Sequence, residues 1–292
     1  MEEKISIGVS GGSGLVGSRV VEMLGKKYDM LTLGRTDGFD ISNSASFSKF
    51  KDRNIKYFLH MAAKADVDGS EEEKDLGESS EAWRINVDGT KNVSRFCKEN
   101  DIKLIYISTD FVFDGKKPQG EFYTEADLPN PINFYAKTKY EGEKMVQESG
   151  ARYMILRIAY PYRKEFAIKK DFVRAILDRL RQGLQINAVT DHIMCPTFID
   201  DIAKVIGGLI EKDESGIFHC VGSTPISPYD AAIKIAEQFN IDKSLIKSTT
   251  RDVYFTDKAL RPFNLYLKND RIENLGFEMK SFNEGLEELN KS

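Results

Sequence analysis

Short apolar runs alternate along the chain with longer segments in which apolar residues recur every three or four positions. Runs rich in β-branched and aromatic residues are typical of strands, and the longer recurrence is typical of helices that cover a core. The strands are expected near residues 5–10, 30–33, 57–61, 103–108, 153–158 and 216–221. The helices are expected at residues 15–24, 80–99, 133–148, 171–182, 199–211 and 228–239. This alternation predicts an α/β fold with a parallel sheet built from βαβ units.

Composition narrows the class of protein. The 292 residues, 41% of them hydrophobic and 30% charged, suffice for one large core or for a main domain with a smaller one. The formal net charge of -4 argues against nucleic acid or a membrane surface as a partner. Cys97, Cys195 and Cys220 have neither disulfide-framework nor metal-ligand spacing, and no apolar run resembles a signal peptide or a membrane span. We therefore expect a cytoplasmic protein.

A glycine-rich loop joins the first expected strand to the first expected helix. Glycine permits a tight turn and a close approach of the backbone to phosphate, and a helix amino terminus offers unpaired N–H groups to an anion. A flexible turn with incidental glycines is the alternative, but the strand before the loop and the helix after it favour a nicotinamide dinucleotide and a Rossmann-type doubly wound sheet. The residues expected to hold the pyrophosphate are Gly11, Gly12, Ser13, Gly14, Leu15, Val16 and Gly17.

Positions after the next strands extend the expected cofactor site. Arg35 follows the second strand, where a site for NAD usually has an acidic residue, so we expect NADP with Arg35 at its 2′-phosphate. NAD is the alternative cofactor, because a surface arginine at a strand end is also common. The other expected cofactor residues are Asp40, Ile41, Ala62, Ala63, Lys64 and Ser108, and loop or packing roles are equally open for several of them.

The chain divides near residue 160, where the alternation becomes less regular. Residues 1–160 are expected to form the NADP(H)-binding domain. Residues 161–292 are expected to form a smaller α/β part that mainly binds substrate, with segments returning to the first domain. Residues 66–81 are acidic and poor in apolar side chains, and we interpret them as a solvated loop whose position leaves a role near the cofactor open.

Tyr135 and Lys139 lie four residues apart near the start of an expected helix, on one helix face. A nearby ammonium stabilises a phenolate and lowers the pKa of a tyrosine, so Tyr135 is a candidate proton donor. Such spacing alone is as easily a surface pair. Ser108, Thr109 and Asp110 favour the chemical interpretation because they end the fourth expected strand, and reacting groups gather at the carboxyl ends of parallel strands. Thr109 is the candidate for orienting a substrate carbonyl.

These features together resemble the extended short-chain dehydrogenase/reductase superfamily. Within it, residues 108–115, 130–135, 191–197 and 260–264 resemble motifs of the dTDP-4-dehydrorhamnose reductase family. The resemblance implies that Thr109, Tyr135 and Lys139 form the catalytic triad. It also implies that NADPH gives a hydride, and Tyr135 a proton, to a nucleotide-linked 4-keto-6-deoxy sugar. A homodimer is the default expectation for the oligomeric state.

The resemblance weakens where the sugar would bind. Residues 157–163 lack the tryptophan of the family's Thr-Ser-Trp-x-Tyr run, and His192 and Met194 replace a glutamine and a glycine. These differences bear on the identity of the sugar more than on the chemistry. The expected substrate-binding residues are Asp110, Val112, Tyr160, Asp191, His192, Pro196 and Arg261. The three histidines show no metal-ligand spacing, so no metal site is expected.

Two other functions stay open. The chain also resembles the beta subunits of methionine adenosyltransferase, which implies an NADP-binding regulatory subunit. The presence of Tyr135 and Lys139 does not separate that function from a reductase. The third is an epimerase or dehydratase of nucleotide sugars, although a 4,6-dehydratase would be expected to have an acidic pair where Asp110 is followed by Phe111.

Overall fold

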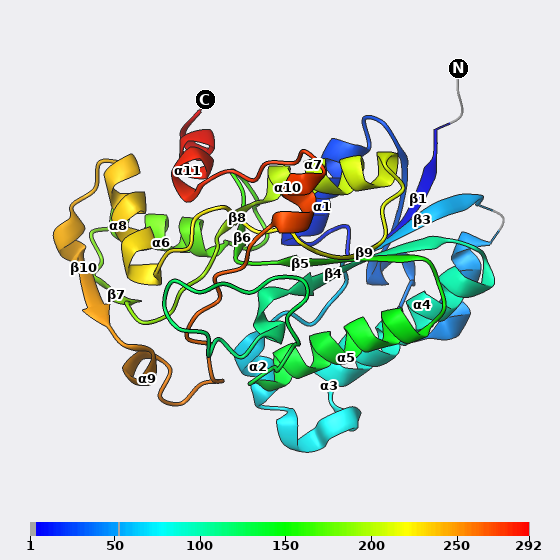
Figure 1. Ribbon diagram of the computed structural model, residues 1–292, viewed down its shortest axis with the longest axis horizontal. Coiled ribbons are helices and arrows are strands. Elements are labelled where there is room, and N and C mark those ends of the chain that lie inside the picture. Colours follow the sequence, from blue (N-terminus) through cyan, green and yellow to red (C-terminus); the bar gives the residue numbers. More distant parts are fainter. Residues whose placement is uncertain (1–3, 52, 292) are drawn as a thin grey trace.

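The centre of the structure is a six-stranded sheet in which neighbouring strands run parallel (Figure 1). The computed structural model describes residues 4–51 and 53–291. Across the sheet the strands are β2 (Asp29–Leu33), β1 (Ser6–Ser10), β3 (Ile55–His60), β4 (Lys103–Thr109), β5 (Tyr153–Ile158) and β9 (Gly216–His219). The strand order changes direction at β1, so the carboxyl ends of β1 and β3 form the topological switch point of a doubly wound sheet. The expected Rossmann-type fold is confirmed.

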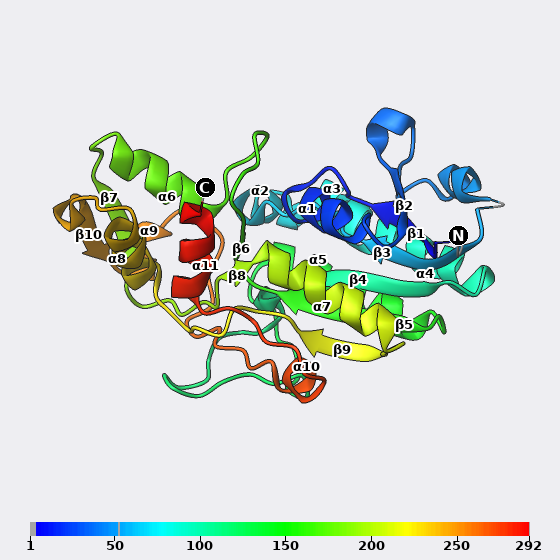
Figure 2. The ribbon, with the colours of Figure 1, turned by 90° about the horizontal axis from the view of Figure 1, so that it is seen from above.

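Helices cover both faces of this sheet (Figures 1 and 2). On one face α1 (Leu15–Leu24) packs beside α7 (Ile199–Glu211), and on the other lie α4 (Gly89–Glu99) and α5 (Phe134–Glu148). Every residue of β4 is buried because helices cover both of its sides. The carboxyl ends of the strands stay free of these helices and are where the site is built.

The C-terminal part forms the smaller α/β layer that the sequence predicted (Figure 2). It contains the helices α6 (Phe172–Arg181), α8 (Pro228–Gln238), α9 (Arg251–Tyr254) and α11 (Phe282–Asn290). Two short parallel strand pairs belong to it, β7 (Ile186–Val189) with β10 (Ile246–Thr249) and β6 (Pro161–Tyr162) with β8 (Thr197–Phe198). After residue 160 the chain also returns to the main sheet through α7, β9 and α10 (Asp270–Asn274).

The interpretation of residues 66–81 as a solvated loop was wrong. They form α2 (Val67–Glu71), a 3₁₀ segment (Lys74–Ser79) and the first residue of α3 (Glu81–Trp83). Side-chain caps explain why so polar a stretch is helical: Asp66 accepts the N–H of Gly69, and Ser80 accepts the N–H of Trp83. Asp66 and Ser80 thus each cap the start of a short helix.

The helix expected over residues 80–99 is also interrupted. A π-helical turn, Arg84–Asp88, separates α3 from α4. Turns of this kind are often found at functional sites because they change the direction of side chains relative to a regular helix. The remaining short 3₁₀ segments are Arg35–Asp37, Ser44–Phe50, Asp110–Val112 and Lys243–Leu245.

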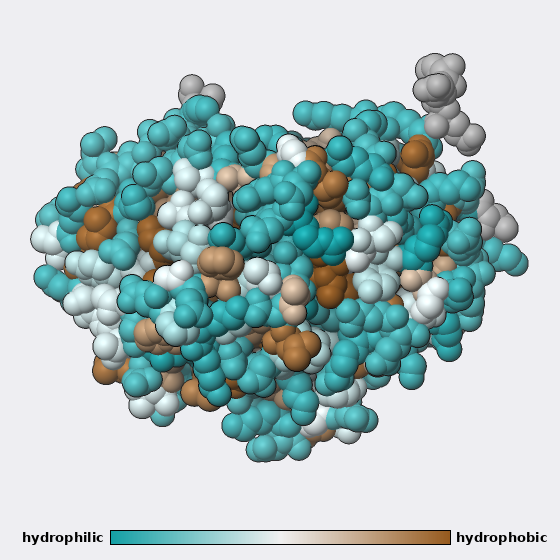
Figure 3. Space-filling view, in the orientation of Figure 1, coloured by the Kyte–Doolittle hydropathy of each residue, from teal (hydrophilic) through white to brown (hydrophobic). Residues whose placement is uncertain are grey.

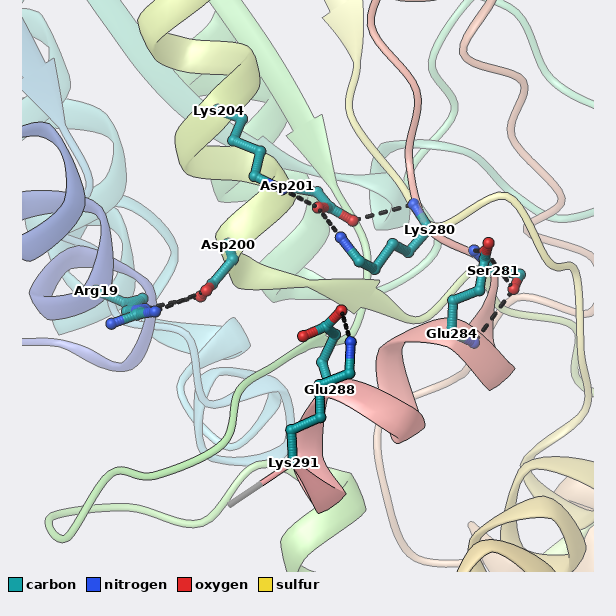
Figure 4. A network of polar contacts seen from close by, with 9 residues as sticks. All are labelled: Arg19, Asp200, Asp201, Lys204, Lys280, Ser281, Glu284, Glu288 and Lys291. Atoms are coloured by element: carbon teal, nitrogen blue, oxygen red, sulfur yellow. Dashed lines mark hydrogen bonds and ion pairs between the residues drawn. The ribbon is translucent and has the colours of Figure 1, made fainter.

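Polar contacts fasten both α1 and the C-terminal segment to α7 (Figure 4). Arg19 donates from Nε and Nη2 to the two carboxylate oxygens of Asp200, at 2.8 and 2.7 Å. The buried carboxylate of Asp201 accepts both the backbone N–H and the ammonium of Lys280, each at 3.0 Å. Ser281 follows and caps α11. Two adjacent aspartates of α7 therefore hold separate parts of the chain in place.

The outer surface is dominated by polar side chains. On the face shown in Figure 3, hydrophobic residues occur singly or in small groups among hydrophilic ones. None of the helices in the described part of the chain is long and apolar enough to cross a membrane.

A buried ion pair joins α5 to β5. Arg157 donates from Nε and Nη2 to the two carboxylate oxygens of Glu143, at 3.0 and 2.8 Å. Both side chains are almost fully buried, and the guanidinium also lies 5.0 Å from the ring centroid of Phe113. Removal of one partner leaves an uncompensated charge in the core, and this lowers the stability of the folded protein strongly.

Glu143→Gln is therefore expected to lower the free energy of unfolding by about 3–5 kcal/mol. Urea unfolding at pH 7 measures the change. Lys27→Gln, which removes an exposed ion pair with Glu211, is the control and is expected to change stability little. Equal losses in the two variants would contradict the importance assigned to the buried pair.

Candidate functional site

The loop between β1 and α1 lies against the carboxyl end of β3. Gly11 has a φ of 76°, and a Cβ there would lie 2.4 Å from the backbone nitrogen of Ala62. A Cβ on Gly17 would lie 2.1 Å from the carbonyl oxygen of Gly11, so glycine is required at both positions. Gly14 gives α1 no side-chain cap. The N–H groups of the first turn of α1 are therefore suited to an anionic ligand.

A pocket of about 390 Å³ lies over this loop, at the switch point of the sheet. The expected cofactor residues that line it are Gly11, Gly12, Ser13, Gly14, Arg35, Asp40, Ile41, Ala62 and Ala63. It is also lined by residues that were not among those expected at the cofactor, namely Ser10, Thr32, Leu33, Gly34, Thr36, Asp37, Phe39, Met61, Arg84 and Ile85. The other expected cofactor residues, Leu15, Val16, Gly17, Lys64, Ser108, Tyr135 and Lys139, are not among the lining residues. Segments after β1, β2 and β3 thus meet in one pocket.

Two guanidinium groups line this pocket. Arg35 belongs to the 3₁₀ turn after β2 and is exposed. Arg84 comes from the π-helical turn, and its Nη1 atom lies 3.8 Å from Oδ2 of Asp40. The acidic side chain of Asp37 accepts the backbone N–H of Gly34 at 3.0 Å. A pocket lined by two arginines suits a ligand that carries a phosphate.

Thr109 and Tyr135 come together from β4 and α5. Thr109 ends β4 and is buried, whereas Tyr135, the second residue of α5, is partly exposed. Asn133 fixes the start of α5 by accepting the N–H of Ala136 at 2.8 Å. Burial raises the pKa of Tyr135 above its usual value, and the nearby Thr109 opposes this rise only in part. The phenol therefore holds its proton at neutral pH.

The pKa of Tyr135 was expected to be lowered by Lys139, but burial raises it, and Lys139 is not among the groups that shift it. The ammonium of Lys139 is buried, donates to the carbonyl of Ile107 at 2.8 Å and lies 4.1 Å from the ring centroid of Tyr106. Burial lowers the pKa of Lys139 to about 7, although Glu143 acts to raise it. Burial removes both side chains from water, and this desolvation sets the direction of both pKa shifts. The four-residue spacing of Tyr135 and Lys139 along a helix does not reveal whether they are buried.

A buried chain of hydrogen bonds connects the pocket to α5. His60 Nδ1 lies 2.7 Å from the hydroxyl of Ser10, and Nε2 lies 3.0 Å from that of Thr90. Thr90 donates to the carbonyl of Asn86, whose amide donates to Thr138 at 2.9 Å. Burial lowers the pKa of His60 to about 3, so the ring is neutral, with Nε2–H donating to Thr90 and Nδ1 accepting from Ser10.

Lys64 is held by the acidic segment rather than by the pocket. Its ammonium pairs with Glu73 and, at 3.1 Å, with Glu81. Its backbone N–H donates to Asn86 at 2.9 Å. The carboxylates between β3 and α4 thus neutralise a residue that was expected to bind the cofactor.

The residues expected at the sugar fall into separate groups. Tyr160 and His192 are hydrogen-bonded to each other. Arg261 donates to Asp68 at 2.8 Å, and Asp191 accepts the N–H of Arg251 at 2.7 Å, so both are engaged within the protein. Val112 and Pro196 are buried in the packing.

Asp110 is a buried carboxyl group beside Thr109. Its Oδ1 accepts the hydroxyl of Thr109 at 3.0 Å, while its Oδ2 has no hydrogen-bond partner in the described part of the chain. Burial raises the pKa of Asp110 to about 7. Protonated and ionised forms therefore coexist near neutral pH.

The histidines are buried and hydrogen-bonded. His219, for example, lies with Nδ1 2.9 Å from the carbonyl of Lys268. Within residues 4–51 and 53–291, no group of three or more His, Cys, Asp or Glu side chains is arranged to hold a metal ion.

Comparisons with known proteins agree with this geometry. The family model described as the RmlD substrate binding domain matches residues 5–292. The chain is 35% identical over 238 residues to methionine adenosyltransferase 2 subunit beta of Bos taurus, covering 79% of this chain and 68% of that protein. It is 30% identical over 225 residues to dTDP-4-dehydrorhamnose reductase of Sinorhizobium fredii, covering 74% and 72%. A crystal structure of dTDP-4-dehydrorhamnose reductase from Bacillus anthracis in complex with NADP superposes with a TM-score of 0.89, at 29% identity and with 99% of both chains covered.

The carboxyl of Asp110 gives a prediction about stability. Its pKa in the folded protein, about 7, lies above the unfolded value of about 3.9, so its contribution to stability is present below pH 4 and is lost as the pH rises through 7. Asp110→Asn cannot ionise. Thermal unfolding is therefore expected to show a larger gain from this substitution at pH 8 than at pH 5.

Asp257→Asn, at an exposed position, controls for the change of side chain. A stability difference between Asp110→Asn and the unsubstituted protein that does not vary with pH would show that Asp110 does not titrate in this range.

Proposed function

We propose that this chain, which belongs to the RmlD substrate-binding domain family as its motifs predicted, is an NADPH-dependent reductase of a nucleotide-linked 4-keto-6-deoxy sugar. The observation that carries the proposal is the dinucleotide-type pocket at the switch point of the sheet, together with Thr109 at the carboxyl end of β4 in the same sheet and Tyr135 in the first turn of α5, which packs against β4. Two of the similar proteins are dTDP-4-dehydrorhamnose reductases, which supports a dTDP-linked sugar as the substrate.

The residues around the pocket fit NADP(H). The glycine loop and the first turn of α1 would receive the pyrophosphate, because Gly11 and Gly17 leave the backbone open to close approach. Arg35 and Arg84 would receive the 2′-phosphate. The crystal structure of the similar reductase from Bacillus anthracis contains NADP, which supports this assignment. When bound, this cofactor supplies the hydride.

The residues of the chain supply the proton and the orientation. Tyr135 carries its proton at neutral pH and would donate it to the oxygen of the substrate ketone. Thr109 would align the carbonyl from the end of β4. Lys139, one turn along α5, supplies the positive charge that compensates the phenolate left after transfer, since its pKa of about 7 leaves part of the population charged.

Tyr135→Phe is expected to reduce turnover at least about 100-fold, because it removes the proton donor and preserves the ring. NADPH absorbance in the presence of dTDP-4-dehydro-L-rhamnose measures turnover. Tyr254→Phe, an exposed tyrosine on α9, is the control. Turnover that survives in Tyr135→Phe would refute Tyr135 as the donor.

Arg35→Ala is expected to weaken NADPH binding about 10- to 100-fold, because it removes a charge-assisted hydrogen bond to the 2′-phosphate. NADH lacks the 2′-phosphate and serves as the internal control, with little change expected. Fluorescence titration of both cofactors gives the comparison. Equal weakening of the two would refute the role of Arg35 at the 2′-phosphate.

A second candidate is an NADP-binding regulatory subunit. The 35% identity to the Bos taurus methionine adenosyltransferase subunit, which exceeds the identity to the Sinorhizobium fredii reductase, favours it. This function predicts tight NADP(H) binding without turnover and co-purification with an enzyme from the native host. Turnover with a nucleotide-sugar ketone, and purification without a stoichiometric partner, would decide against it.

A further inference from the structure

Tyr160 has an unusual backbone conformation. Of the five non-glycine residues in the described chain with positive φ, four are Asn or Asp, and the fifth is Tyr160 with a φ of 39°. Asn and Asp tolerate this region, whereas a bulky side chain is strained there. Such strain persists only where the surrounding structure enforces it, and it often marks a functional position.

Several contacts hold Tyr160 in this conformation. Its hydroxyl lies 2.8 Å from Nε2 of His192, and Nδ1 of His192 lies 2.6 Å from the carbonyl oxygen of Pro262. Its ring packs edge to face against Phe111 and Phe172. The hydroxyl is thus held at a defined place by His192, which Pro262 fixes in turn.

The direction of these hydrogen bonds follows from chemistry. A carbonyl oxygen only accepts, so Nδ1 of His192 carries a proton and donates it to Pro262. Burial lowers the pKa of His192 to about 4, so the ring is neutral and its Nε2 is a bare acceptor. Tyr160 must therefore donate its single hydroxyl proton to His192. Only the lone pairs of the phenol oxygen remain for another partner.

Tyr160 is also close to the reacting groups. It follows β5, whose last residue, Ile158, pairs with Thr109 at the end of β4. Phe111 contacts both Tyr160 and Tyr135, with ring centroids 6.1 and 6.4 Å away. Tyr160 is partly exposed.

We propose that Tyr160, with its proton committed to His192, selects a hydroxyl group on the sugar ring of the substrate. The phenol oxygen accepts a hydrogen bond from that hydroxyl and offers nothing to a carbonyl or phosphate oxygen, which can only accept. This inference rests on the proposed function for the identity of the ligand. Under this proposal Tyr160 and His192 determine which sugar binds. Both positions differ from the motifs of the reductases that the chain resembles.

The test compares dTDP-L-rhamnose with its 2-deoxy and 3-deoxy analogues, titrated into the NADP-bound protein by calorimetry. In the unsubstituted protein, one of the two deletions is expected to weaken binding about 10-fold, the effect of one unmatched hydrogen bond. In Tyr160→Phe, which keeps the ring, that penalty is expected to disappear because the acceptor is gone. Tyr254→Phe is the matched control and should retain the penalty.

A second measurement needs no substrate. The ring ¹⁵N chemical shifts of His192, assigned with His192→Gln, are expected to show a protonated Nδ1 and a bare Nε2. The opposite tautomer would overturn the donor assignment and with it the proposal.

The outcomes separate the two hypotheses. If dTDP-L-rhamnose does not bind the unsubstituted protein, the proposed function fails. If it binds and Tyr160→Phe keeps the full deoxy penalty, or if neither deletion weakens binding, the role of Tyr160 fails while the proposed function stands.

Discussion

The close contact between the glycine loop and the end of β3 is the constraint on which the rest of the site depends. A side chain on Gly11 would collide with the backbone at Ala62, and one on Gly17 would collide with the loop itself. Because both positions lack a Cβ, α1 can begin directly above the sheet and present its free N–H groups there. The pocket at the switch point is lined by this loop and by the ends of the paired strands β1 and β3.

The site behaves as one unit because buried polar groups connect its parts. Hydrogen bonds run from Ser10 at the loop through His60, Thr90 and Asn86 to Thr138 on the helix that carries Tyr135. Each donor in this chain has an acceptor, so the chain is rigid as well as buried. The glycine loop and the helix that carries Tyr135 are thus held in a fixed relation.

Parts of the site were visible in the sequence because they depend on near neighbours. The glycine spacing, the strand end at Thr109 and the four-residue spacing of Tyr135 and Lys139 are all local patterns, and the family resemblance they supported is confirmed. Arg84 left no such signal. It lines the pocket only because a π-helical turn interrupts a segment whose pattern predicts an ordinary helix.

The sequence by itself determined the α/β fold, the position of the dinucleotide-type loop and the family, since periodicity and short motifs require only neighbouring residues. Tertiary structure alone decided the protonation of the buried side chains and the hydrogen-bond partners of Tyr160, His192 and Arg261. The pKa of Lys139, the neutral ring of His192 and the proton of Tyr160 depend on burial and on groups distant in sequence. Loss of water is a property of the packed molecule, so no local pattern encodes it.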